Sequence, residues 1–223
     1  MRDTRAELRA ALEAAERAVE ALKAALAALP PGAPKPAPAA IPTGRRPVPA
    51  AGVALIKQYE GLHDGDKSTP NILEPQADPI GIFTVGWGYA LFENGKPVKD
   101  KARALAIWHR RWPLGFTRAD ADALCVEVAQ DVCDRVLRLL PGVELNDNEL
   151  GALVSLAYNI GVGEVGGASD FADSTVRKRL LANDRKGAAA AFAMWKYAGG
   201  KVLAGLVNRR AAEAALFLKG EAS

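Results

Sequence analysis

The chain reads LIKQYEG from Leu55 to Gly61 and DPIGIFTVGWGY from Asp78 to Tyr89. The first stretch closes a helical pattern on a glutamate. The second is rich in β-branched and aromatic residues and glycine, and it carries an aspartate and a threonine. Cleavage of a glycosidic bond needs one acid that donates a proton and another group that handles water. We therefore predict that Glu60, Asp78 and Thr84 are the catalytic residues.

These stretches, together with LNDNELGALVSLAYNIGVG (145–163) and the segment 174–220, resemble the phage-type lysozymes of glycoside hydrolase family 24. The signature of that family is a helix-borne Glu, then an Asp, then a Thr inside a Thr-x-Gly-x-Gly strand. The matching residues here are Glu60, Asp78, Thr84, Gly86 and Gly88. The chain departs from the pattern in two ways. Its segment between Glu60 and Asp78 is longer than in the compact members, and Tyr89 stands where many members have His.

The resemblance implies an α+β fold of two lobes, with a small antiparallel sheet lobe, a helical lobe and a cleft between them. It implies an endolysin that cuts the β-1,4 bond between N-acetylmuramic acid and N-acetylglucosamine in bacterial peptidoglycan. Glu60 would protonate the leaving oxygen from a partly desolvated site, while Asp78 and Thr84 hold the attacking water. Inversion at the anomeric carbon is implied, which requires carboxyl groups about 6.5–9.5 Å apart. This chemistry needs no cofactor and no metal.

Several further residues are expected to bind substrate. Gly86 and Gly88 weaken a strand unless something needs close backbone approach, and a sugar chain along the sheet would supply that reason. The resemblance implies that Arg209 approaches the catalytic Glu, although an inter-lobe clamp is an equal alternative. Asn159 belongs to the matching segment. Aromatic rings could stack on sugars, although at helical spacing they are more often core residues; they are Trp87, Trp108, Trp112, Tyr158 and Trp195.

Other interpretations of these residues remain open. Asp64, Asp66 and Glu74, in the irregular stretch 63–77, are alternative carboxylates, or merely solvated loop charges. GVGEVG at 161–166 fits a dinucleotide-binding pattern, but it follows a helix rather than a strand, so we assign no nucleotide. The chain could instead be a non-catalytic cell-wall-binding or virion structural module. It could also be a lytic transglycosylase, which makes an anhydro product without an Asp-bound water.

The periodicity of the sequence predicts the elements of the presumed catalytic part. Helices are expected over 49–60, 117–139, 146–159, 174–181, 184–195 and 202–218. Thr117 with Asp120, and Asn146 with Glu149, have the spacing of helix starts. A small antiparallel sheet is expected from Asp78 to Val98, with a turn at Asn94-Gly95.

The N-terminal part has a different composition. Residues 1–29 carry apolar residues at heptad spacing and a capping-box start at Thr4, which predicts a helix that either self-associates or lies on its own catalytic domain. Residues 30–49 contain eight prolines and predict an extended linker. The catalytic domain is then 50–223. Residues 4–29 could also contact the cell envelope.

Charge and cysteine content exclude several classes of function. The net charge is +3, and the first 50 of the 223 residues, with eight basic and five acidic groups, hold the whole excess. A nucleic-acid partner is therefore not expected. Cys125 and Cys133 would lie about 12 Å apart on one helix, too far for a disulfide. With His63 and His109 they form no metal-ligand spacing, and both histidines are expected to be ordinary surface or edge residues.

The sequence also bears on where the protein would act. It has no transmembrane stretch, and Arg and Glu interrupt the N-terminus where a signal peptide would be apolar. We expect the protein in the host cytoplasm until lysis. The resemblance then implies a pore-forming holin as the partner that gives it access to the cell wall.

Overall fold

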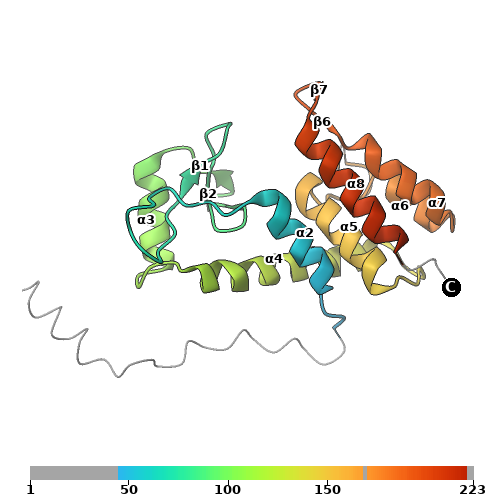
Figure 1. Cartoon of the computed structure of the whole chain (residues 1–223), viewed down its shortest axis with the longest axis horizontal. Coiled ribbons are helices and arrows are strands. Elements are labelled where there is room, and N and C mark those ends of the chain that lie inside the picture. Colours follow the sequence, from blue (N-terminus) through green and yellow to red (C-terminus); the bar gives the residue numbers. More distant parts are fainter. Residues whose placement is uncertain (1–44, 168–169, 220–223) are drawn as a thin grey trace, which may run out of the picture. The chain divides into compact units, whose positions relative to one another are not determined.

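The computed structural model describes residues 45–167 and 170–219 (Figure 1). The predicted heptad helix and most of the predicted linker lie outside these residues, so both stay predictions. Residues 45–49 are held against the rest of the domain. The side chain of Gln130 accepts a hydrogen bond from the Val48 amide at 2.8 Å and donates one to the Arg46 carbonyl at 2.9 Å.

Helices make up most of the described part. The helices are α2 (Ala50–Glu60), α3 (Lys101–Arg111), α4 (Arg118–Leu139), α5 (Asp147–Ile160), α6 (Thr175–Leu181), α7 (Arg185–Ala191), the 3-10 turn η1 (Phe192–Met194) and α8 (Ala204–Leu218). Both predicted helix starts are present. Thr117 begins α4 and Asn146 begins α5, each with a reciprocal capping box. No helix of the described residues is long and apolar enough to cross a membrane.

The strands are short and form three separate sheets. The strands β1 (Gln76–Ala77), β2 (Phe83–Val85) and β3 (Tyr89–Ala90) form an antiparallel sheet in that order, with Thr84 opposite both Gln76 and Ala90. The pairs β4 (Phe92–Glu93) with β5 (Lys96–Pro97), and β6 (Tyr197–Ala198) with β7 (Lys201–Val202), form two further hairpins. The predicted turn at Asn94-Gly95 connects β4 to β5. The predicted α+β class is confirmed.

Several features differ from the predicted elements. The strand β1 lies in the stretch 63–77 that was expected to be irregular, and the strands between Asp78 and Val98 belong to two sheets rather than one. The helix α3 was not predicted, although Asp100 begins it by accepting a hydrogen bond from the Arg103 amide. The predicted helix 202–218 begins at Ala204, because Val202 belongs to the unpredicted hairpin β6–β7.

The packing of α2 against α5 sets the position of the end of α2. Gly52 and Gly151 meet where the two helices cross, and a Cβ atom on Gly52 would lie 2.6 Å from the Gly151 carbonyl oxygen. The helix α8 packs on α5 as well, and Figure 1 shows α4 running from the side of α3 and the sheet to the side of α5. Glu60, the last residue of α2, therefore lies where the helical part meets the sheet.

Candidate active site

Glu60 ends α2, and Gly61 breaks the helix with a φ of 70°. The Glu60 side chain is 20% exposed, and its Oε1 accepts a hydrogen bond from Nη1 of Arg209 at 2.7 Å. Arg209 is buried on α8. A second contact joins the same two helices, because the Tyr59 hydroxyl donates to the Asn208 carbonyl at 3.1 Å. The predicted acid is therefore a half-buried carboxylate fixed by a charged hydrogen bond.

The chain after β2 passes close to this carboxylate. Gly88 has a φ of 78°, and a Cβ atom there would lie 3.0 Å from Oε2 of Glu60. Gly86 has a φ of 60°, and its carbonyl accepts a hydrogen bond from the His63 amide at 2.8 Å. Both glycines have backbone conformations that other residues rarely adopt. They bring the strand to the segment that leaves α2.

Thr84 is buried in the middle of β2. Its hydroxyl lies 3.0 Å from Nδ1 of His63 and donates to the Gln76 carbonyl at 3.2 Å. Because His63 follows Glu60 by three residues, it connects the end of α2 to the strand that carries Thr84. Sequence reasoning assigned His63 no catalytic or binding role, and its half-buried ring, next to an isolated backbone bridge, contacts Thr84. The only sequence feature that could have indicated this contact is the position of His63, three residues after Glu60.

Asp78 follows β1 and is half-buried. Its Oδ1 accepts hydrogen bonds from the amides of Ile80 at 3.0 Å and Ile82 at 2.8 Å. These bonds fix the carboxylate in the loop 78–82 that connects β1 to β2. Asp78 and Thr84 thus share one hairpin, and Thr84 is joined to the α2 end through His63.

The alternative carboxylates stabilise their own loop. Oδ1 of Asp64 accepts hydrogen bonds from the amides of Asp66 and Glu74. Asp66 accepts two hydrogen bonds from Ser68, which lower its pKa from the ordinary value. Asp64 and Asp66 are thus loop-forming residues.

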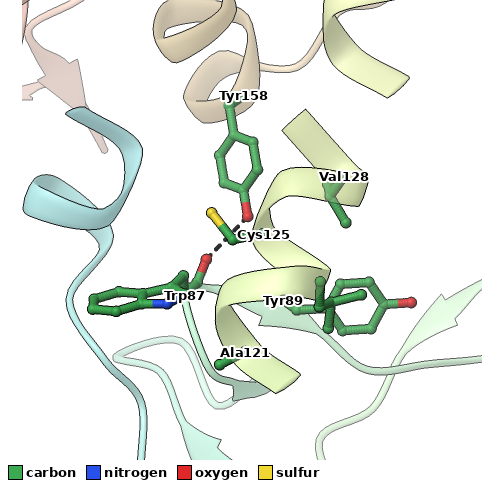
Figure 2. Close-up of a pocket in the computed structure, with 7 residues that line it drawn as sticks. Trp87, Tyr89, Ala121, Cys125, Val128 and Tyr158 are labelled. Atoms are coloured by element: carbon green, nitrogen blue, oxygen red, sulfur yellow. Dashed lines mark hydrogen bonds between the residues drawn. The ribbon is translucent and has the colours of Figure 1, made fainter. Parts of the chain in front are cut away.

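Trp87 is not a free platform for a sugar. Its side chain is 8% exposed, and its ring lines a small apolar pocket with Tyr89, Cys125, Tyr158 and others (Figure 2). The indole Nε1 donates to Oδ1 of Asp122 at 2.7 Å. Desolvation raises the pKa of Asp122, but hydrogen bonds from Lys57 and Trp87 outweigh it, so that this pKa lies below its ordinary value.

Tyr158 and Asn159 lie in the last turn of α5 and make contacts on different sides of it. The Tyr158 hydroxyl donates to the Trp87 carbonyl at 3.0 Å, which ties α5 to the segment after β2, and burial raises the pKa of this phenol (Figure 2). Asn159 is exposed, and its Oδ1 accepts from Nη1 of Arg210 at 3.1 Å. The Tyr89 hydroxyl accepts a hydrogen bond from Nη1 of Arg111 at 2.6 Å. Trp108 lies in the core, and Trp112 and Trp195 pack against it.

A metal centre finds no support in the described part of the chain. Within residues 45–167 and 170–219, no group of three or more His, Cys, Asp or Glu side chains is arranged to hold a metal ion.

The chain is similar to known proteins over most of its length. A family model described as phage lysozyme matches residues 67–213. The endolysin of Bacillus phage PZA is 33% identical over 171 residues, which is 76% of this chain and 54% of that protein. The endolysin of Salmonella phage P22 is 33% identical over 167 residues, which is 75% of this chain and 94% of that protein. The chain spans about half the length of the curated Bacillus phage relatives it matches.

A solved structure has a similar fold. The endolysin from Escherichia coli O157:H7 phage FAHEc1 superposes with a TM-score of 0.57 at 30% identity, covering 78% of this chain and 95% of that chain.

Proposed function

The chain belongs to the phage lysozyme family, and we propose that it is an endolysin that hydrolyses the β-1,4 bond between N-acetylmuramic acid and N-acetylglucosamine of bacterial peptidoglycan. The observation that carries this proposal is the half-buried Glu60 carboxylate, held by Arg209 on one side and bordered by Gly88 on the other. Peptidoglycan is the partner that follows from this function. A holin partner and self-association through residues 4–29 rest on the sequence alone and stay expectations.

In the proposed mechanism, Glu60 is the general acid that protonates the oxygen of the leaving sugar. The Glu60 side chain is 20% exposed, so its carboxyl group can reach a bound sugar, while the contact with Arg209 fixes its orientation.

Asp78 and Thr84 would hold the attacking water. The Thr84 hydroxyl donates to the Gln76 carbonyl, and if it accepts from His63 it keeps one lone pair for a hydrogen of the water. Asp78 uses only Oδ1 in its hydrogen bonds to the described residues, which leaves Oδ2 to accept the other hydrogen. Water held by two groups on a different element from the acid suits attack on the opposite face of the sugar and inversion.

The decisive test is hydrolysis of purified peptidoglycan by the wild type, Glu60→Gln and Glu74→Gln, followed as loss of turbidity. Wild type and Glu74→Gln are expected to be active. Glu74 lies in the loop 63–77, and the hydrogen bonds that join it to Asp64 and Gly65 come from its backbone, which the substitution keeps. Glu60→Gln should lose about 100- to 10,000-fold, the range typical of a general acid. An inactive wild type that still binds cell walls would favour the non-catalytic module. Mass spectrometry of the products distinguishes hydrolysis from an anhydro-forming transglycosylase.

A further inference from the structure

Glu213 is a fully buried carboxylate for which the proposed mechanism has no use. It lies on α8 between two arginines that are also buried, Arg209 and Arg210. Its Oε1 accepts hydrogen bonds from Nε of Arg209 at 3.1 Å, from Nη2 of Arg210 at 2.9 Å and from the Ser155 hydroxyl at 2.7 Å. Its Oε2 lies 2.7 Å from Nε of Arg210, without the alignment of a hydrogen bond.

Burial and the surrounding contacts act on the charges of this cluster in opposite directions. Desolvation raises the pKa of Glu213 and lowers the pKa of Arg210, and the attraction between the two side chains opposes both shifts. Three donors on one carboxylate oxygen favour the anion. A buried charge left without its partner costs several kcal/mol, so the trio has to stay paired throughout the reaction.

The charge balance of this cluster depends on Glu60. When Glu60 is ionised, the two arginines face two carboxylates and the cluster is neutral. When Glu60 carries the proton that the reaction requires, one positive charge is in excess, and Glu213 is then the only anion that contacts Arg209 among the described residues. Without Glu213 the excess would be two positive charges in a desolvated site, which would drive Glu60 to give up its proton.

The other charged or titratable groups around Glu60 make contacts elsewhere or, in the case of the Cys125 thiol, stay neutral. From α2, Lys57 forms a salt bridge at 2.7 Å with Asp122 of α4. From α4, burial raises the pKa of the Cys125 thiol to about 11. From α5, Tyr158 donates to the Trp87 carbonyl, and from the segment after α2, His63 contacts Thr84. From the sheet side the neighbour is Gly88, which has no side chain. Arg209, Arg210 and Glu213 are therefore the charged side chains that are connected to Glu60 by salt bridges.

We propose, on the premise that Glu60 is the general acid, that Glu213 is a positioning residue: it neutralises the two buried arginines so that Arg209 stays on the Glu60 carboxyl whether this is protonated or ionised. Glu213 does not touch the substrate. Its role is to let the Arg209 contact orient Glu60 without removing the catalytic proton.

The proposal predicts opposite effects for two substitutions in the same cluster. Glu213→Gln removes a negative charge, so the basic limb of the pH profile of hydrolysis should move to lower pH by about one unit, the size expected for a charge change at close range. Arg210→Gln removes a positive charge and should move that limb to higher pH. In both variants KM should stay within about twofold of the wild-type value. The substitutions are expected to change the proton transfer, not the contacts that bind the substrate.

Glu149→Gln is the matched control. Glu149 is also a buried carboxylate in a salt bridge, at 2.8 Å from Arg185, but it caps the start of α5 and does not contact Arg209. This variant should lose stability and keep the wild-type pH profile. If Glu213→Gln does not fold, the upward shift in Arg210→Gln still tests the proposal. Equal profiles, or shifts in the same direction, in the folded cluster variants would overturn it.

A second measurement separates this proposal from the proposed function. Carbon-13 NMR of the Glu60 carboxyl gives its titration midpoint in the wild type and in both variants, and needs no turnover. If the wild type hydrolyses no peptidoglycan but the midpoints move in opposite directions, the proposed function fails and the charge balance holds. If hydrolysis is normal and the midpoints do not move, the role of Glu213 is refuted.

Discussion

Gly88 lies where the chain after β2 passes the carboxyl group of Glu60. Replacing it with alanine adds one methyl group and tests whether activity needs the backbone this close to the carboxyl group. In Gly88→Ala the new Cβ would lie 3.0 Å from Oε2 of Glu60. The carboxyl group then has to give by a few tenths of an ångström. Because a misplacement of about 1 Å costs on the order of 100-fold in rate, the expected loss here is about several-fold to tenfold. We expect this loss in a turbidity assay on peptidoglycan.

Gly95→Ala is the control for backbone strain. Gly95 has a φ of 74°, nearly the same as the 78° of Gly88, but a Cβ atom there has nothing within 4 Å. Each variant should lose about 1–2 kcal/mol in the free energy of unfolding, because both place an alanine in the left-handed region. Only Gly88→Ala should lose activity. Equal activities in the two variants would mean that the space beside Glu60 is not needed.

Individual residues also show how far the sequence could predict this site. The order of Glu60, Asp78 and Thr84 could be matched to a family pattern, and so could the two glycines. The pairing of His63 with Thr84 could not, because it depends on a backbone bridge between segments 23 residues apart, His63 to Gly86. Charge partners such as Glu213 were missed for a similar reason. A glutamate in a helical, charged stretch indicates a solvated face unless the packing around it is known.

At the scale of elements, the crossing of α2 and α5 determines where Glu60 lies relative to Arg209. Gly52→Ala would place a Cβ atom 2.6 Å from the carbonyl oxygen and 2.7 Å from the Cα of Gly151, and backbone atoms cannot move aside as a flexible side chain can. The helices have to separate, at a cost of about 1–3 kcal/mol or more. Because α2 ends on Glu60, this separation should also reduce hydrolysis.

Gly205→Ala provides the comparison for a glycine in a helix. Nothing lies within 4 Å of a Cβ atom at this position near the start of α8. Alanine is a better helix former by up to about 1 kcal/mol, so this variant should be as stable as the wild type or more stable. Chemical denaturation of both variants measures the difference. A Gly52→Ala variant with wild-type stability and activity would show that the crossing is not tight.

Elements with strong periodicity could be predicted to within about two residues, the usual uncertainty of helix ends. The hairpin β6–β7 was missed, although Gly199 and Gly200 both have positive φ and Gly-Gly is a signal for a tight turn. Its strands have two residues each, too few to show alternation. The helix α3 was missed because the stretch is basic and only Ala104 and Trp108 are buried.

At the scale of the whole molecule, α4 joins the sheet side to the helical side. Its two buried cysteines, Cys125 and Cys133, can therefore serve as probes of unfolding on the two sides. Cys125 and Cys133 are free and buried, and burial raises the pKa of each thiol from 9.0 to about 11. The thiolate is the reactive form, and roughly one thiol in a thousand would be ionised at pH 8. Neither cysteine should react with a disulfide reagent in the native protein at this pH.

Labelling at pH 8 across a denaturant series then tests whether the described part unfolds as a unit. Residues from α2, the sheet, α4, α5 and α8 contribute to one buried core, so both thiols should become reactive in a single transition that coincides with the loss of helical signal. The variant Cys125→Ser leaves Cys133 as the only probe and should give the same midpoint apart from its own change in stability. If Cys125 reacted well before Cys133, the pocket beside Trp87 would open locally, and the sheet side would be less stable than the helical side.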